Sequence, residues 1–189
     1  RPIDGNEKSS EQIKRNNECL EKIVGYKFIE YAAPNGAHPQ PGATRALEAL
    51  GVIAYYYVGD SGSFPNRVFS DGKMVSEKAI AFPIMPFEKT ASIWEARALA
   101  KKSEREITEW FNSTLDYVTA NKTVRLIYSH PYDVQNYPQA IKAFLDKVSA
   151  MRANNELMVR PMSEYAKFFF RFLKTTYAFN TDGKQLTIK

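Results

Sequence analysis

Apolar residues recur every three or four positions in several segments of the chain, the spacing that lines one face of an α-helix. In the segment 103–120, the clearest case, Ile107, Phe111 and Leu115 fall on one face. The same spacing predicts further helices over residues 9–23, 45–50, 138–152 and 162–175. We expect Thr44 to cap the short helix that follows it, because a threonine side chain can accept a hydrogen bond from a free helix N–H.

Short runs of β-branched and aromatic residues alternate with these helices. The run 52–58 is the strongest, because such side chains fit the pleated surface of a sheet. Strands are predicted over residues 26–33, 52–58, 78–82, 124–128 and 157–159. We expect Pro83 to end the strand before it, since proline has no N–H to donate to a neighbouring strand. The turn-forming segment 181–183 predicts a C-terminal hairpin over 177–188.

Strand, loop and helix alternate along most of the chain, which is typical of an α/β fold with mostly parallel strands. We divide the chain into a main domain over residues 1–175 and a C-terminal hairpin, or the start of a following segment, over 176–189. In such folds functional residues gather at the carboxyl edge of the sheet. We therefore expect a site at the strand ends 33–36, 58–60 and 129–130.

Composition narrows the class of protein. Of 189 residues, 44% are hydrophobic and 13% aromatic, which is enough for a buried core. The net charge of +5 is modest, and basic residues such as Lys101, Lys102 and Arg105 alternate with the acids Glu104 and Glu106. This pattern is typical of a solvated helix face, so we expect no nucleic-acid partner. The apolar runs are too short to cross a bilayer, so no membrane span is expected.

His130 is the sharpest candidate for chemistry. It follows a predicted strand and precedes a proline, so its ring is expected at a strand's carboxyl end, where it can exchange a proton near neutral pH. A histidine that only satisfies loop hydrogen bonds is an equal alternative. Asp60 lies at another strand end. Its carboxylate would orient His130 and hold it protonated, or it only forms a turn.

Weaker signals lie in other loops. The sequence Pro34-Asn35-Gly36 can aim a backbone N–H at a developing oxyanion, or it forms a plain tight turn. His38 has no carboxylate or second histidine at ligand spacing, so we interpret it as a surface residue rather than a metal ligand. Cys19 is the single cysteine, which excludes an internal disulfide, and we expect it in the core.

The order of these segments resembles the polysaccharide deacetylase family, carbohydrate esterase family four. That family has a helix, a strand ending in a Pro-aromatic-Gly turn, and a helix closed by Leu-Gly before a new strand. The corresponding segments here are 17–25, 28–36 and 46–52. The family's late motif, a strand of alternating leucines ending in histidine, resembles the sequence LIYSH at 126–130, with Tyr128 in place of the second leucine. The resemblance extends over about residues 8–175.

This resemblance implies a partial, distorted (β/α) barrel, of which the chain would be the C-terminal half. It also implies a hydrolase that removes N-acetyl groups from an amino-sugar polysaccharide or oligosaccharide. In the family a divalent metal, often zinc, activates a water, an aspartate acts as base, and the late histidine protonates the leaving amine.

The same resemblance gives roles to individual residues. His130 would be the general acid, and Asp60 would tune it. Leu126 would contact the acetyl methyl group, and Tyr128, beside it in the motif, would also bind substrate. After Pro34, the backbone of Asn35 would lie at the oxyanion hole, so we count both among the substrate-binding residues.

The sequence also departs from the family. The paired aspartates and the His-x-x-x-His motif that hold the metal are not in this sequence. We expect them upstream, and we expect the chain alone to bind no metal and to be inert. Ala32 and Asn35 stand where the family usually has an arginine and an aromatic residue. Two alternatives therefore stay open: a non-catalytic carbohydrate-binding or scaffold relative, and an unrelated α/β domain with the same order of segments.

Two expectations concern the location of the protein and its association with other copies. The family usually acts outside the cytoplasm, so the resemblance implies a periplasmic, cell-surface or secreted protein. Half a barrel leaves strand edges without partners, so we expect either that the chain pairs with a second copy through those edges, or that the missing half was present and has been lost.

Overall fold

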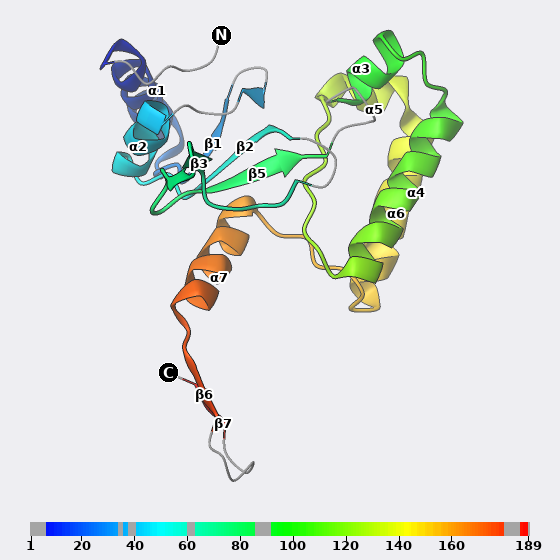
Figure 1. The fold of residues 1–189 in the computed structure, drawn as a ribbon. Helices are drawn as coiled ribbons and strands as arrows, with labels where there is room; N and C mark the ends of the chain where they lie inside the picture. Colours follow the sequence, from blue (N-terminus) through cyan, green and yellow to red (C-terminus); the bar gives the residue numbers. More distant parts are fainter. Residues whose placement is uncertain are drawn as a thin grey trace.

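The computed structural model describes residues 7–33, 36–37, 41–59, 63–85, 92–179 and 186–188 (Figure 1). The helices are α1 (Glu7–Val24), α2 (Pro41–Ala49), α3 (Ile93–Ala98), α4 (Glu104–Asn121), α5 (Pro131–Asn136), α6 (Pro138–Ala153) and α7 (Met162–Lys174). The strands are β1 (Glu30–Ala32), β2 (Ala54–Val58), β3 (Phe69–Ser70), β4 (Lys73–Met74), β5 (Ile80–Ile84), β6 (Tyr177–Phe179) and β7 (Leu186–Ile188). The fold is mixed α/β, as the alternation of segments predicted.

Three parallel strands form the central sheet, in the order β1-β2-β5. The segment after α4 adds one more pairing, because Leu126 forms a parallel bridge with Ile84 and its carbonyl accepts the N–H of Met85 at 2.9 Å. These four segments run in the same direction, so their carboxyl ends meet at one edge. Within the described residues the sheet does not close into a barrel.

β5 runs through Pro83, so the expectation that this proline ends its strand is wrong. The N–H of Ile80 points toward the β2 side of the strand, and the direction alternates from one residue to the next. Pro83 therefore has its nitrogen on the far side from β2. On that side Ala81 pairs with Asn66 and Ile84 forms the bridge with Leu126, and Pro83 lies between these two positions of the strand. No donor is required there, which lets a proline occupy an inner strand.

The sheet is covered on both faces (Figure 1). Tyr55 and Ala81 belong to a core cluster that includes Leu47 of α2 and Ile13 of α1. The neighbouring positions, such as Phe82, belong to a second cluster with Ala166 of α7. This division follows the two-residue period of a strand, which sends successive side chains to opposite faces.

A third cluster joins α3, α4 and α6 beside the sheet (Figure 1). Glu104 at the start of α4 accepts the N–H groups of Gln139 and Ala140 at the start of α6, at 2.7 and 3.1 Å. Further along both helices, Phe111 and Phe144 stack at 4.4 Å between ring centroids. These pairings show that α4 and α6 run parallel to each other.

The structure confirms the long helices and the C-terminal hairpin, in which β6 and β7 pair antiparallel. It corrects the prediction for Thr44, which is fully buried inside α2 and caps nothing, because the helix already begins at Pro41. It also corrects the strand predicted over 157–159, which forms no ladder and exposes 75% of Met158. Near the end of α1, Ile23 is 74% exposed, and Cys19 is exposed rather than in the core.

Candidate functional site

His130 lies where the segment that bridges to β5 enters α5. It is the N-cap residue of α5, and Pro131 occupies the first helical position, where the missing N–H costs nothing. The carbonyl of His130 accepts the N–H of Asp133 at 2.9 Å, which closes the first turn. The His130 side chain is 30% exposed, so solvent and solutes reach the ring.

Both nitrogens of the His130 ring face polar groups of its own segment. Nε2 lies 3.0 Å from the hydroxyl of Tyr128, which is hydrogen-bond distance. Nδ1 lies 3.6 Å from Oδ2 of Asp133, which is too long for a hydrogen bond but close enough for an ion pair when the ring is protonated. Nδ1 forms no hydrogen bond with any residue that the structure describes.

Asp133 is the carboxylate that accompanies His130, and the sequence interpretation missed it. Its side chain is only 1% exposed. Oδ2 accepts the backbone N–H of His130 at 2.8 Å and the hydroxyl of Ser129 at 3.3 Å. An acidic residue three positions after an N-cap, with proline at the first helical position, is a recognised helix-start pattern. That signal was present in the sequence and would have placed Asp133 against His130.

Four aromatic rings form a row through this site. The ring of Tyr56 on β2 lies 5.8 Å from that of Tyr128, measured between centroids. Tyr128 meets the His130 ring edge-on at 4.8 Å, and His130 stacks on Tyr132 at 4.8 Å with an interplanar angle of 9°. Tyr132 is 44% exposed. The row therefore leads from the sheet to an aromatic face in contact with solvent.

Two tyrosines of this row, Tyr56 and Tyr132, have pKa values raised above the ordinary value of a tyrosine. Desolvation raises the pKa of Tyr132, and the nearby carboxylate of Asp133 raises it further. Burial also raises the pKa of Tyr56, with a smaller contribution from Tyr128. These hydroxyls can therefore donate hydrogen bonds at neutral pH.

Leu126 and Tyr128, the two substrate-binding residues predicted on this segment, have different surroundings. Leu126 is partly buried against the cluster that contains Phe82 and α7, and Tyr128 contacts Tyr56 and His130. Ile127, between them, packs against the α4–α6 cluster. Of the two predicted residues, Tyr128 is the one that touches His130.

The ends of the parallel strands come close together at the same edge of the sheet. A Cβ on Gly36 would lie 2.5 Å from Cγ2 of Val58, so the turn after β1 approaches the end of β2 without room for a side chain. A Cβ on Gly59 would likewise clash with Pro83 on β5. The remaining sequence candidates lie outside the described residues: Pro34, Asn35, His38 and Asp60. The approach of Pro34, Asn35 and Asp60 to His130 stays a prediction.

Comparisons with family models, with curated proteins and with solved structures each give no match for this chain. The resemblance to polysaccharide deacetylases therefore rests on the residues and on their order in the chain.

The described residues do not fit a zinc site. They contain no group of three or more histidine, cysteine, aspartate or glutamate side chains placed to hold a metal ion. A catalytic zinc needs about three protein ligands in fixed geometry. The zinc that the family resemblance implies for the full-length parent stays a prediction.

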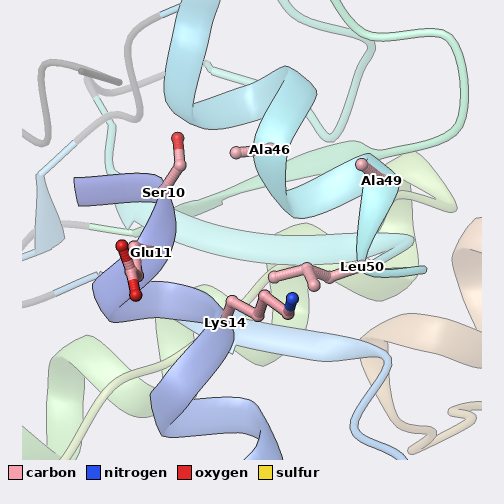
Figure 2. Close-up of a pocket in the computed structure, with 6 residues that line it drawn as sticks. All are labelled: Ser10, Glu11, Lys14, Ala46, Ala49 and Leu50. Carbon is pink, nitrogen blue, oxygen red and sulfur yellow. The ribbon is translucent and has the colours of Figure 1, made fainter. Parts of the chain in front are cut away.

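A pocket of about 380 Å³ lies between α1 and α2 (Figure 2). Its lining residues are Ser10, Glu11, Lys14, Ala46, Ala49 and Leu50. Glu11 is already paired with Arg15 at 2.7 Å. The pocket lies on the α1–α2 side of the molecule and His130 at the start of α5, so it adds nothing to the His130 site (Figure 1).

Proposed function

We propose that this chain is part of a metal-dependent hydrolase that removes N-acetyl groups from an amino-sugar polysaccharide, with His130 as the general acid. The observation that carries the proposal is the grouping of His130, Asp133 and Tyr128 at the carboxyl edge of a parallel sheet. Active sites of α/β barrels are built at this edge.

The topology supports the finer form of the fold, a partial (β/α) barrel. Each parallel strand lies beside the previous parallel strand of the chain, through to the bridge at Leu126. The helices α4 and α6 also run parallel to each other, as adjacent helices do around such a barrel.

The chemistry follows from the contacts of the imidazole. When His130 carries two protons, the buried Asp133 carboxylate faces the charged Nδ1–H, so Nε2 is the nitrogen that releases a proton. We propose a relay in which Nε2–H donates to the Tyr128 oxygen while the Tyr128 O–H proton passes to the departing amine nitrogen. The tyrosine ends protonated and the histidine neutral, so the protons balance.

The remaining parts of the proposal come from the family resemblance alone. Asn35 would supply an oxyanion N–H beside Pro34, Leu126 would contact the acetyl methyl group, and Asp60 would add a second carboxylate near His130. The divalent metal and its ligands would belong to other parts of the full-length protein. The protein would act on its substrate in the periplasm, at the cell surface or outside the cell.

The test is acetate release from N-acetylglucosamine oligomers by the full-length protein. His130→Gln should lower kcat by about 10²–10⁴-fold, the usual contribution of a general acid, with little change in substrate binding. Tyr128→Phe should also lower kcat, because it removes the relaying hydroxyl while keeping the ring. Tyr117→Phe, the same change at a 41% exposed tyrosine of α4, is the matched control and should leave kcat unchanged.

Two results would count against this proposal. Full activity in His130→Gln would remove His130 from the chemistry. A wild-type full-length protein that binds the oligomers but releases no acetate would favour the second candidate, a non-catalytic carbohydrate-binding relative.

One observation favours that second candidate. Nε2 of His130 is already occupied by the Tyr128 hydroxyl, while Tyr132 offers an exposed ring that is stacked and held in place on His130. A rigid aromatic face of this kind is suited to binding rather than proton transfer. In that case Tyr132→Ala abolishes oligomer binding by the chain, as followed by NMR titration, and His130→Gln weakens it, because the ring on which Tyr132 stacks is lost.

A further inference from the structure

One face of α7 packs against the sheet as far as Phe169 and Phe170, which are partly buried against the cluster that contains Phe82. Ala166 is fully buried in the cluster beneath the sheet, and the N–H of Ser163 is held by Oε1 of Glu30 on β1 at 2.8 Å. Further along, Phe168 is 54% exposed, Phe172 53% and Leu173 45%. Figure 1 shows the cause: α7 leaves the sheet at an angle, and β6 and β7 continue away from the body.

We refer to the exposed side of residues 167–174 as the overhang of α7. Apolar and basic residues occupy neighbouring strips of this overhang. Phe168 and Phe172 are four residues apart, so they lie one above the other, and their rings stack at 6.5 Å. Lys167 and Arg171 each come one residue earlier, which places them about 100° around the helix. Lys174 extends the basic strip by one more turn.

The basic strip has no acidic partner in the described part of the chain. From Lys167 to Lys174 the sequence contains no aspartate or glutamate. The acid of the first turn, Glu164, lies 3.6 Å from Arg160, outside the overhang. Three cations and three exposed apolar side chains therefore share eight consecutive positions.

We propose that the second half of α7 docks on an anionic lipid surface. The apolar side chains Phe168 and Phe172 enter the boundary between head groups and acyl chains, and the three cations contact the lipid phosphates. No helix of the described residues is long and apolar enough to cross a membrane, so α7 lies on the surface.

Charge complementarity favours a lipid surface over a second copy of the chain. In a two-fold contact the same patch meets itself, so Lys167, Arg171 and Lys174 would face their own equivalents. Like charges placed together without acids repel each other. An anionic surface neutralises the same three cations. It is therefore a more favourable binding partner for this patch than a second copy of the chain.

The experiment is flotation of the full chain with vesicles. The wild-type chain should float with mixed phosphatidylglycerol and phosphatidylcholine vesicles, bind pure phosphatidylcholine far less, and be released by high salt. Phe168→Ser with Phe172→Ser should abolish flotation. Each of the changes Lys167→Gln, Arg171→Gln and Lys174→Gln should weaken partition roughly fivefold.

The controls separate docking from unfolding and from self-association. Leu145→Ser removes a 56% exposed leucine from α6, beside the Lys142–Asp146 pair, and should float like the wild type. Circular dichroism should be the same for all variants, because the replaced side chains are exposed. Equal binding to neutral and anionic vesicles would overturn the proposal. So would a dimer by light scattering that Phe168→Ser dissociates, without any vesicle binding.

Discussion

Replacing Asp133 by alanine is the sharpest test of how the candidate site is built. The carboxylate is 1% exposed, and its Oδ2 accepts the backbone N–H of His130 at 2.8 Å and the hydroxyl of Ser129 at 3.3 Å. Alanine removes both hydrogen bonds. It also leaves the backbone N–H of the helix-capping residue without its partner.

The magnitude follows from the two contacts. A hydrogen bond to a charged acceptor contributes about 1.5–3 kcal/mol, and the longer bond from Ser129 adds less. We therefore expect Asp133→Ala to lower the free energy of unfolding by about 2–3 kcal/mol. With a denaturant slope of about 2 kcal/mol per molar urea, the midpoint falls by roughly 1 M.

The assay is urea unfolding followed by circular dichroism, with Asp116→Ala as the matched control. Asp116 is 68% exposed on α4 and pairs with Lys147, and such surface pairs contribute about 0–1 kcal/mol. The NMR signals of the His130 ring should shift in Asp133→Ala and stay in place in the control. A loss below about 1 kcal/mol with an unchanged His130 spectrum would refute the assignment of Asp133 as the residue that positions His130.

Two further predictions test the strand ends and the start of α4. Gly59→Ala should destabilise the chain by about 1–3 kcal/mol in the same assay, because the new Cβ would overlap the rigid ring of Pro83. Hydrogen bonds from the backbone and then the side chain of Ser103 lower the pKa of Glu106 below its ordinary value of 4.5. Glu106→Gln should therefore be less stable than the wild type at pH 7, and the difference should shrink as the pH falls through the lowered pKa; a constant difference would contradict this.

Long amphipathic patterns were predictable because they depend on periodicity alone. The helix predicted over 103–120 is α4, with Ile107, Phe111 and Leu115 buried as expected. Burial along the helix predicted over 9–23 is uneven, because Ile13 of α1 is buried and Ile23 is 74% exposed. Periodicity shows which side chains share a face, and the packing of neighbouring elements decides how much of that face is covered.

Strand positions depended on neighbours that a single segment does not reveal. Pro83 sits inside β5 because its nitrogen points to a gap between two bridges, and this gap exists only once Asn66 and Leu126 are in place. The segment 124–128 forms one bridge rather than a full strand, so its β propensity overstated its pairing. For the site, the sequence analysis predicted His130 at a strand end but did not predict Asp133 beside it. The pattern that indicates Asp133 is the one of a helix start, an acidic residue three positions after the N-cap.

The exposed parts of the sheet and of α7 have different consequences for association. β1, at one end of the described sheet, is only three residues long, and Glu30 is already engaged in holding the start of α7. Short edge strands are a common way of limiting pairing between sheets. The expected pairing of two copies through sheet edges stays a prediction, and β1 offers little backbone for it.

The overhang of α7 exposes Phe168 and Phe172 at more than half of their surface, with cations beside them. Hydrophobic association should therefore begin at α7 rather than at the sheet edge, and the vesicle and light-scattering measurements on Phe168→Ser decide what it associates with.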